Sequence, residues 1–341
     1  MTAAPPIDEV QASLNETVAL VQRVTGAPEG FAMAFDPDVL LPTQFSSLAP
    51  IDPDRALLAC RNEQQDADVL KFRDLANAET PIGTLSVDSD AACRTSIRWQ
   101  ELNIPRGRRH ELRAAMLDPR GVCWGAFALY RHARPGFSRP DLDRVAGLLP
   151  ERATHLARSM TVSRAPGTPS EATTLVLSES GEVVAAPDGA LRWLETMRRG
   201  DALDRIGMLL ASVAARIRRP GHTDQGRAAV RVRMRSSGGA WTTLLAEPLA
   251  GYGETRGISV VVMPTDSAQL FPLLVAAYGV SGRERDIVHG VLDGLDTKAI
   301  AGRLSISVNT VQDHLKSVFD KTGVRSRREL AFVFSREPKA G

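Results

Sequence analysis

The fold of the C-terminal part of the chain is decided by one stretch, SGRERDIVHGVLDGLDTKAIAGRLSISVNTVQDHLKSVFDKTGVRSRRELAFVF, residues 281–334. Its apolar residues recur at helical spacing in four short segments, which predicts four helices. Only Ser305-Ile306-Ser307 separates the second from the third, and this link is too short for anything but a sharp turn. The pattern predicts a helix-turn-helix module with a fourth packing helix.

The ends of these helices carry residues that satisfy free backbone groups. The candidate N-caps share a side-chain hydroxyl that accepts from a backbone N–H, and they are Ser281, Thr297, Ser307 and Ser326. Glu284 and Glu329 each follow a capping serine by three residues, which predicts two capping boxes. With Thr297 as its cap, the second helix is expected over about 298–304. Gly323 is expected to end the third helix at positive φ.

The third helix has an apolar face and a polar face. Val311, Leu315 and Val318 stand at i, i+4 and i+7, so we expect them to face one core. The opposite face then carries amide, carboxylate and ammonium groups, from Asn309, Gln312, Asp313 and Lys316. Such groups near a helix N-terminus suit the edges of base pairs in a major groove.

Positive charge is concentrated around this face. Between residues 298 and 328 the sequence has seven basic residues, Lys298, Arg303, Lys316, Lys321, Arg325, Arg327 and Arg328. Against them stand only Asp313 and Asp320, so the segment has a net charge of +5. A positive surface of this kind attracts phosphate groups in a salt-dependent way.

These features together resemble the C-terminal DNA-binding domain of the LuxR/FixJ family of bacterial transcriptional regulators. The residues that carry the resemblance are Arg283-Glu284, Ile300-Ala301, Leu304, Ser307, Thr310-Val311, His314, Lys321 and Ser326-Arg327. The chain departs from the family at Val280-Ser281, where Leu-Thr is usual, and at Asp296, where a small residue is usual. Neither departure removes an expected cap or core position.

The resemblance and the polar face together give expected DNA contacts. Residues expected to contact base edges are Asn309, Thr310, Gln312, Asp313 and Lys316. Residues expected to contact phosphates are Thr297, Lys298, Arg303, Ser307, Lys321, Arg325, Arg327 and Arg328. Asp313 is the exception, because a carboxylate repels phosphate. Two roles stay open for it, accepting from cytosine N4 and orienting Lys316.

Length and composition set wider limits. A chain of 341 residues with 43% hydrophobic and 24% charged residues is expected to form two or three domains with real cores. Three widely spaced cysteines argue against a secreted disulfide scaffold. We find no signal peptide or membrane-spanning run in the sequence, so we expect a cytoplasmic protein with no membrane association.

The N-terminal part predicts an α+β domain over residues 9–160. Two β segments, residues 110–117 and 122–131, flank Asp118-Pro119-Arg120-Gly121, a turn sequence that predicts an antiparallel hairpin. A long helix follows. The segments LRAAMLDPRGVCWGAFALYR and GFSRPDLDRVAGLL resemble a GAF domain of the kind found before LuxR-type modules in actinobacterial regulators. The resemblance implies a small-molecule sensor or dimerisation domain.

The remaining segments complete a multidomain α+β and all-α architecture. Residues 161–172 are rich in Pro, Ser and Gly and predict a linker. Over 173–265, two strands, helices and three further strands resemble a PAS-like domain. A connecting helix is expected over 266–280, followed by the four-helix DNA-binding domain over 281–336.

The sequence offers little support for catalysis. It contains neither a phosphate-binding G-x-x-x-x-G-K-[ST] loop nor a G-x-S-x-G nucleophile motif, and its histidines lack metal-ligand spacing. We therefore expect no catalytic residue, cofactor or metal. Cys93, Trp99, Cys123 and Trp124 have two open interpretations, a redox- or ligand-sensing pocket and ordinary core packing.

The leading hypothesis is therefore a ligand-responsive, sequence-specific transcriptional regulator. It is expected to respond to a small-molecule or protein signal through its N-terminal sensor domains. It is expected to bind double-stranded DNA as a homodimer on two half-sites about 34 Å apart, with an unidentified small-molecule effector and RNA polymerase as candidate partners. Two alternatives stay open: a GAF-fold redox enzyme that uses cysteine, and an interaction scaffold that binds no DNA. The effector, the operator and the direction of regulation are not encoded in any motif.

Overall fold

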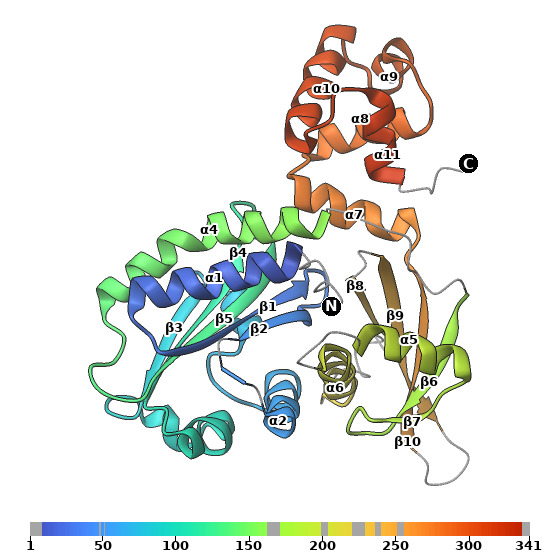
Figure 1. The fold of residues 1–341 in the computed structure, drawn as a ribbon. Helices are drawn as coiled ribbons and strands as arrows, with labels where there is room; N and C mark the ends of the chain where they lie inside the picture. Colours follow the sequence, from blue (N-terminus) through green and yellow to red (C-terminus); the bar gives the residue numbers. More distant parts are fainter. Residues whose placement is uncertain are drawn as a thin grey trace, which may run out of the picture. The chain divides into compact units, whose positions relative to one another are not determined.

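A computed structural model of the chain describes residues 9–47, 49–50, 52–161, 171–198, 204–219, 229–235, 240–250 and 256–335. The chain divides into two compact units, residues 1–264 and 265–341 (Figure 1). The first eight residues, most of the expected linker (162–170) and residues 236–239 lie outside the described residues.

Within the described residues of the first unit, ten strands form two five-stranded sheets. The strands of the first sheet are β1 (Glu29–Asp36), β2 (Leu41–Ser47), β3 (Ile82–Ser86), β4 (His110–Leu117) and β5 (Cys123–Arg131). Their order is β2-β1-β5-β4-β3, and every neighbouring pair is antiparallel. The predicted β4–β5 hairpin is confirmed, with Gly121 at a φ of +82° in its turn.

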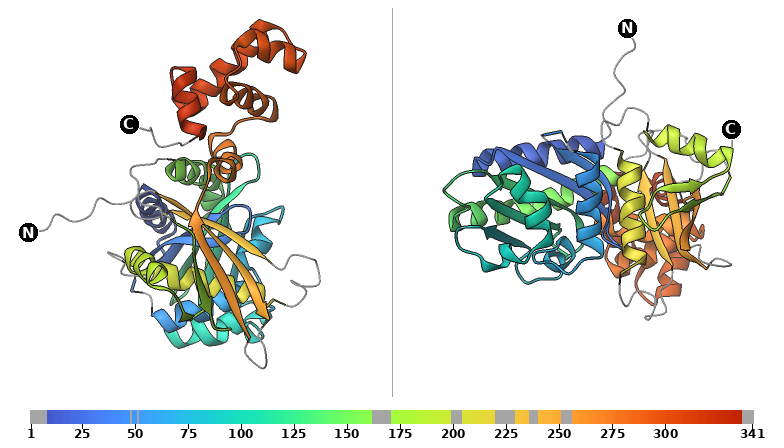
Figure 2. Two further views of the ribbon diagram at one scale, coloured as in Figure 1. Left: turned by 90° about the vertical axis from the view of Figure 1, so that its right-hand side faces the viewer. Right: turned by 90° about the horizontal axis from the view of Figure 1, so that it is seen from below.

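Helices cover both faces of this sheet. The long helices α1 (Glu9–Thr25) and α4 (Arg139–Thr161) lie side by side on one face (Figure 2). Helix α1 forms because its apolar residues, Val10, Leu14, Val18 and Val21, recur at helical spacing and are all buried. The other face is covered by α2 (Pro53–Gln64), α3 (Phe72–Ala76) and the short turns η1 (Ala91–Arg94), η2 (Trp99–Asn103) and η3 (Ile104–Arg106).

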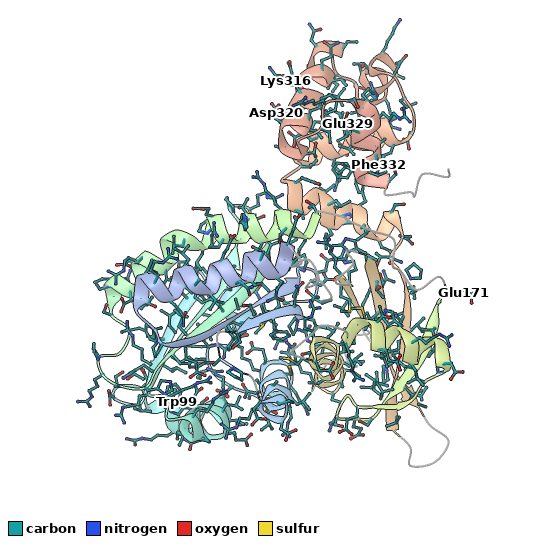
Figure 3. The ribbon with its side chains drawn as sticks, in the orientation of Figure 1. Trp99, Glu171, Lys316, Asp320, Glu329 and Phe332 are labelled. Carbon is teal, nitrogen blue, oxygen red and sulfur yellow. The ribbon has the colours of Figure 1, made fainter. Side chains whose placement is uncertain are left out.

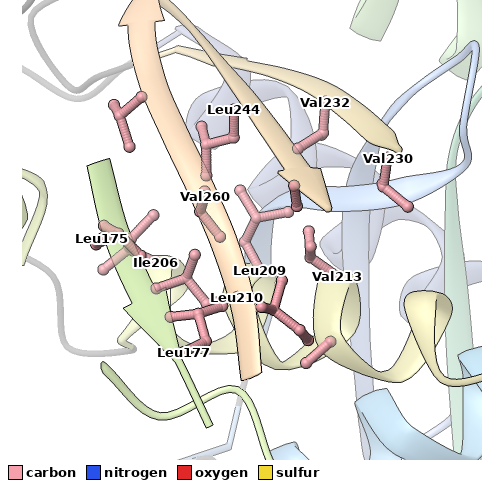
Figure 4. Close-up of a cluster of buried hydrophobic side chains, with 14 of the residues drawn as sticks. Leu175, Leu177, Ile206, Leu209, Leu210, Val213, Val230, Val232, Leu244 and Val260 are labelled. Atoms are coloured by element: carbon pink, nitrogen blue, oxygen red, sulfur yellow. The ribbon is translucent and has the colours of Figure 1, made fainter. Parts of the chain in front are cut away.

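The second sheet repeats the strand order of the first. Its strands are β6 (Thr173–Leu177), β7 (Val183–Ala185), β8 (Val230–Arg235), β9 (Trp241–Ala250) and β10 (Arg256–Pro264), in the order β7-β6-β10-β9-β8. Helices α5 (Asp188–Arg198) and α6 (Arg205–Ile217) pack against it. The core between them is aliphatic, with Leu175 and Val260 of the sheet facing Leu209 and Val213 of α6 (Figure 4).

The two sheets are held together by contacts within the first unit. Leu41 of β2 is fully buried in the core of the second sheet. Arg233 of β8 binds Asp36 of β1 through two hydrogen bonds, Nη2 to Oδ1 at 2.7 Å and Nε to Oδ2 at 3.0 Å. Arg216 of α6 donates to the side-chain oxygen of Gln64 at 2.6 Å. These contacts join residues from distant parts of the chain.

Strand β8 differs from the expectation in one respect. The alternation of apolar and basic residues over 227–235 predicts a half-exposed strand, but Arg233 is only 5% exposed and Arg235 only 8%. The expectation of an open basic face is wrong there because Asp36 and Asp38 meet Arg233 and neutralise its charge. Arg231 on the same strand is exposed.

Helices make up the second unit. Within residues 265–335 they are α7 (Ser267–Tyr278), α8 (Gly282–Leu292), α9 (Thr297–Leu304), α10 (Val308–Thr322) and α11 (Arg327–Ser335). Helix α10 packs on α8 and α9, and α7 packs on α11. The ring of Phe271 in α7 lies 5.5 Å from that of Phe334 and 4.3 Å from that of His289, centroid to centroid. Aromatic contacts therefore join α7 to the other helices of its unit.

Candidate nucleic-acid interface

The N-termini of α8 and α10 have the predicted caps. The Ser281 hydroxyl accepts from the Glu284 backbone N–H at 3.3 Å, and the Glu284 carboxylate accepts from the Ser281 N–H at 2.6 Å. This is the complete capping box expected from the sequence. The Ser307 hydroxyl accepts from the Thr310 N–H at 3.0 Å. Gly323 ends α10 at a φ of +74°, as predicted.

Two other predicted ends differ in detail. Thr297 is not the cap of α9, because the helix begins at Thr297 and Asp296 accepts from the Ala299 N–H at 2.7 Å. A carboxylate at this position also interacts favourably with the helix dipole. At α11 the Ser326 hydroxyl accepts from the Glu329 backbone N–H at 3.1 Å, as predicted. The Glu329 carboxylate, however, accepts from the Arg325 backbone N–H and not from that of Ser326, so only half of the predicted capping box forms.

The turn between α9 and α10 is closed by backbone hydrogen bonds. Ile306 N–H donates to the Ala301 carbonyl at 3.0 Å, and Ser305 N–H donates to Gly302 at 3.3 Å. Ser305 has a φ of +53°, a conformation that most residues other than glycine seldom adopt. The short link therefore forms the sharp turn of a helix-turn-helix, and it fixes where α10 begins.

Helix α10 has the two faces that the sequence predicts. Val311 and Val318 are fully buried and Leu315 is 6% exposed. The opposite face is exposed, with Asn309, Gln312, Asp313 and Lys316 on it. Lys316 points away from the other helices of its unit (Figure 3). Thr310 is half-buried, and its hydroxyl bonds to that of Ser307 at 2.8 Å.

Three of the basic residues expected to contact phosphates already have partners inside the unit. Lys321 binds both carboxylate oxygens of Glu284, at 2.6 and 2.8 Å. Arg303 binds Asp293 at 2.6 Å. Arg327 donates to the Thr297 hydroxyl at 3.0 Å. These side chains connect helices of the unit to one another or to a neighbouring loop.

The other basic side chains of this surface remain open to solvent. Lys298, Lys316, Arg325 and Arg328 are all exposed. Within the described part of the chain, none of their side chains takes part in an ion pair or a hydrogen bond. Four positive charges of the second unit, including that of Lys316 on the exposed face of α10, are therefore open to solvent.

Glu284 is the main polar contact between α8 and α10. It is 4% exposed, and besides Lys321 it accepts a hydrogen bond from the Ser317 hydroxyl at 2.7 Å. Burial acts to raise the pKa of its carboxyl, but hydrogen bonds from Lys321, Ser281 and Ser317 outweigh this and lower the pKa to about 2. The carboxylate therefore stays charged and fixes the start of α8 against the middle of α10.

The candidate sensor residues do not form one group. Cys93 and Trp99 pack together with Leu85 and line a hollow of about 270 Å³. Cys123 lies in a different cluster, and the Trp124 indole N–H donates to Asp118 at 3.2 Å. Burial raises the pKa of the Cys93 thiol to about 11 and that of Cys123 to about 12. Both thiols are therefore protonated near neutral pH.

A larger set of residues around a cavity was not predicted. The cavity has a volume of about 110 Å³ and is lined by residues of the first sheet, α2 and α6. Its walls include Phe31, Phe35, Phe72, Cys60 and Met208. In the sequence these residues are indistinguishable from ordinary core. The elements that enclose the cavity are also far apart in the chain, so no local motif marks it.

None of the helices among the described residues is long and apolar enough to cross a membrane. The same residues include no group of three His, Cys, Asp or Glu side chains placed to hold a metal ion.

Residues 279–334 match the family model described as bacterial regulatory proteins, luxR family. A monoamine regulon transcriptional regulator of Klebsiella aerogenes is 45% identical over 51 residues, which are 15% of this chain and 22% of that protein. A candidate HTH-type transcriptional regulator of Mycobacterium bovis is 51% identical over 47 residues, 14% of this chain and 5% of that protein. The match thus spans a quarter or less of either relative's length.

Solved structures give weaker likenesses. The GAF domain of the cyanobacteriochrome TePixJ aligns with 48% of this chain and 99% of its own, at 16% identity and a TM-score of 0.31. A VqmA–ligand–DNA complex of Vibrio cholerae covers 48% of this chain and 81% of its own, at 16% identity and a TM-score of 0.22. The family match and the observed α9-turn-α10 geometry coincide, and residues 279–334 are a LuxR-type helix-turn-helix domain.

Proposed function

We propose that this protein is a sequence-specific DNA-binding transcriptional regulator whose helix α10 enters the major groove. The observation that carries the proposal is the exposed polar face at the N-terminal end of α10, in a unit with four exposed basic side chains that have no partner among the described residues. Both named relatives are transcriptional regulators or candidates for that role, and the match to them lies in this same segment.

The proposed base contacts are those on the exposed face of α10. Asn309, Gln312 and Lys316 offer amide and ammonium groups to base edges, with Thr310 beside them at the groove edge. Asp313 either accepts from cytosine N4 or orients Lys316. The operator sequence distinguishes the two roles, because only the first requires a cytosine at the contacted position. Each proposed contact lies in the first turns of α10. In a helix-turn-helix, the N-terminal residues of the recognition helix are the ones that contact base edges.

The proposed phosphate contacts fall into two groups. Lys298, Arg325 and Arg328 have free charges and are the main candidates, together with the hydroxyls of Thr297 and Ser307. Arg303, Lys321 and Arg327 are already bonded inside the unit. For these three we propose a phosphate contact only through the N–H donors that their internal partners leave unused. Because the internal bonds are also lost, substituting any of the three side chains affects folding as well as binding.

We propose the following organisation for the whole chain. Residues 9–160 and 173–265 form the sensor part, joined by 161–172, and residues 266–280 connect it to the DNA-binding part at 281–336. The protein acts as a homodimer on two half-sites about 34 Å apart. The effector is a small molecule, and RNA polymerase is the partner through which transcription changes. The raised pKa values of the buried cysteines weigh against the alternative of a thiolate redox enzyme.

The test is genome-wide mapping of the DNA bound by the full-length protein, followed by gel-shift titration on the enriched sites. We expect a recurrent sequence with two related half-sites, and affinity that falls steeply with salt. Binding to random duplex DNA as tight as to every enriched site would sink sequence-specific recognition. Absence of binding to any duplex at low salt would sink DNA binding altogether.

A further inference from the structure

The cavity in the first unit has aromatic and other apolar side chains from several elements in its wall. Phe31 and Phe35 of β1, Phe72 of α3 and Tyr130 of β5 line it, and Met208 of α6 closes it from the side of the second sheet. Its volume is about 110 Å³. Apolar cavities of roughly 150 Å³ hold a benzene molecule. This space is of the same order but smaller, so the largest molecule that it suits is about the size of one aromatic ring.

Two polar groups in the wall lack partners. Asn103 is completely buried and Arg113 is 2% exposed. Among the described residues, neither the Asn103 Nδ2 nor the Arg113 Nε has a hydrogen-bond acceptor. A buried donor without an acceptor costs about 1–3 kcal/mol. Both side chains line the cavity, so an acceptor placed inside it is the simplest way to satisfy them.

The other atoms of these two side chains are already engaged. The Asn103 oxygen accepts from Arg108 at 3.3 Å. Arg113 binds Glu63 at 2.5 Å and Glu111 at 3.5 Å through its terminal nitrogens, and its guanidinium lies 3.7 Å from the centre of the Phe72 ring. Both side chains are thus fixed in place, and the groups left over are donors.

The charges of the wall also favour an acceptor. Five arginines and two glutamates line the cavity. This excess of positive charge in the lining attracts an electron-rich oxygen of a ligand, whether of a neutral carbonyl or of a carboxylate. It repels a ligand that carries a positive charge. The Cys60 thiol in the wall has its pKa raised by burial to about 11, so it does not act as a nucleophile toward the bound molecule near neutral pH.

We propose that this cavity binds a ring-sized, mostly apolar molecule through one acceptor oxygen, which receives hydrogen bonds from Asn103 Nδ2 and Arg113 Nε. Helix α6 contributes Met208 and Ser212 to the wall, so the bound molecule contacts elements that pack on both sheets of the first unit. This deepens the proposed function, because the cavity becomes the effector site of the regulator. Binding is measured without DNA, so either proposal can fail while the other stands.

The test uses three probes of similar shape on the full-length protein. Benzoate carries a carboxylate, acetophenone a neutral carbonyl, and toluene no acceptor. We expect saturation-transfer NMR to show millimolar or tighter binding of one or both acceptor probes, and at least about tenfold weaker binding of toluene, the effect of losing one charge-assisted hydrogen bond. The better of benzoate and acetophenone identifies the charge of the natural ligand. Hydrogen exchange should slow at amides of both α2 and α6 when the probe is bound.

Two variants and a matched control assign the binding to the named donors. Arg113→Lys keeps the charge but removes the Nε, and Asn103→Asp replaces the donor by an acceptor while keeping the oxygen that Arg108 needs. Arg98→Lys is the control, because Arg98 is an equally buried arginine of the same wall whose Nε already donates to Glu111 at 3.3 Å. Thermal unfolding identifies any variant that fails to fold.

We expect Arg113→Lys and Asn103→Asp to weaken the acceptor probes about tenfold and Arg98→Lys to leave them nearly unchanged. The probe comparison needs no variant and stands even if one variant does not fold. Equal binding of toluene and benzoate, equal losses in Arg113→Lys and Arg98→Lys, or no binding of any probe at millimolar concentration would each overturn the proposal.

Discussion

The two units contain basic side chains at opposite extremes of burial and pairing. In the first unit, Arg98 and Arg233 are buried and each binds a buried carboxylate. In the second unit, Arg325 and Arg328 are exposed and have no partner among the described residues. A buried, paired arginine contributes to folding by cross-linking distant elements, whereas an exposed and unpaired one is free to bind a polyanion. Residue type alone does not decide which role a basic side chain takes.

The Glu284–Lys321 pair falls between these extremes. Glu284 is buried, but Lys321 is half-buried at the edge of the second unit. Its ammonium lies within reach of solvent while it holds α8 against α10. Substitutions that break each kind of contact therefore separate the role in folding from the role in binding a polyanion.

The largest effect is expected at Arg233. Arg233→Met leaves the buried Asp36 carboxylate without its cation, and breaking a buried pair in this way costs about 3–5 kcal/mol. Arg231→Ala on the same strand is the control, because Arg231 is exposed, and it should change stability by less than about 0.5 kcal/mol. Urea unfolding of the full-length protein measures both. Similar midpoints for the two variants would mean that the Arg233–Asp36 pair does not hold β8 to β1.

Glu284→Gln should lower the free energy of unfolding by about 2–3 kcal/mol at neutral pH, since the hydrogen bonds from Lys321, Ser281 and Ser317 lose the buried anion that accepts them. The pKa of Glu284 is lowered in the fold, from 4.5 to about 2. Its stabilisation is therefore complete above pH 4.5 and disappears as the pH falls toward 2. Asp286→Asn, at a partly exposed site on the same helix, is the control.

The pH dependence is read from the difference in unfolding free energy between wild type and Glu284→Gln. That difference should be constant from pH 7 to about pH 5 and shrink at lower pH. A difference that instead grew on acidification would contradict a lowered pKa. A Glu284→Gln effect no larger than that of Asp286→Asn would contradict a structural role for the pair.

The second unit was largely predictable because its signals are local. A capping serine, the glutamate three residues later and the spacing of Val311, Leu315 and Val318 all act within one helix. The errors there were also local. Thr297 and Asp296 are adjacent and both can cap, and the carboxylate was the one that did so.

The first unit was predictable only at the level of its elements. The hairpin turn at Asp118-Pro119-Arg120-Gly121 and the strand patterns follow from nearby residues. The Arg233–Asp36 pair joins residues 197 positions apart, and nothing within β8 indicates where its partner lies. The cavity between the first sheet and α6 depends on the same long-range packing. The periodicity of apolar residues is the same for side chains that line this cavity and for side chains that pack in a core without one, so it cannot distinguish them.

Lys316 is a basic side chain of the exposed kind, without a partner among the described residues. Lys316→Ala removes an exposed, unpaired cation from the proposed reading face, so it should leave unfolding unchanged. It should weaken binding to the operator by about 1–3 kcal/mol and relax specificity at one base position. Gel-shift titration over operators varied one position at a time measures this. Unchanged operator affinity would mean that another face of α10 meets the bases.

The smallest effect is expected at Arg328, an exposed residue of α11 without a partner in the described chain. If it meets a phosphate, Arg328→Ala should weaken all DNA sequences by the same factor and reduce the slope of log affinity against log salt by about 0.9. Arg285→Ala is the control, since Arg285 is exposed on α8 and lies 3.8 Å from Asp286. Equal slopes for Arg328→Ala, Arg285→Ala and wild type would place Arg328 outside the DNA interface. The exposure of an unpaired cation would then not suffice to identify a phosphate contact. The contrast between paired and unpaired arginines would then predict effects on stability but not on DNA binding.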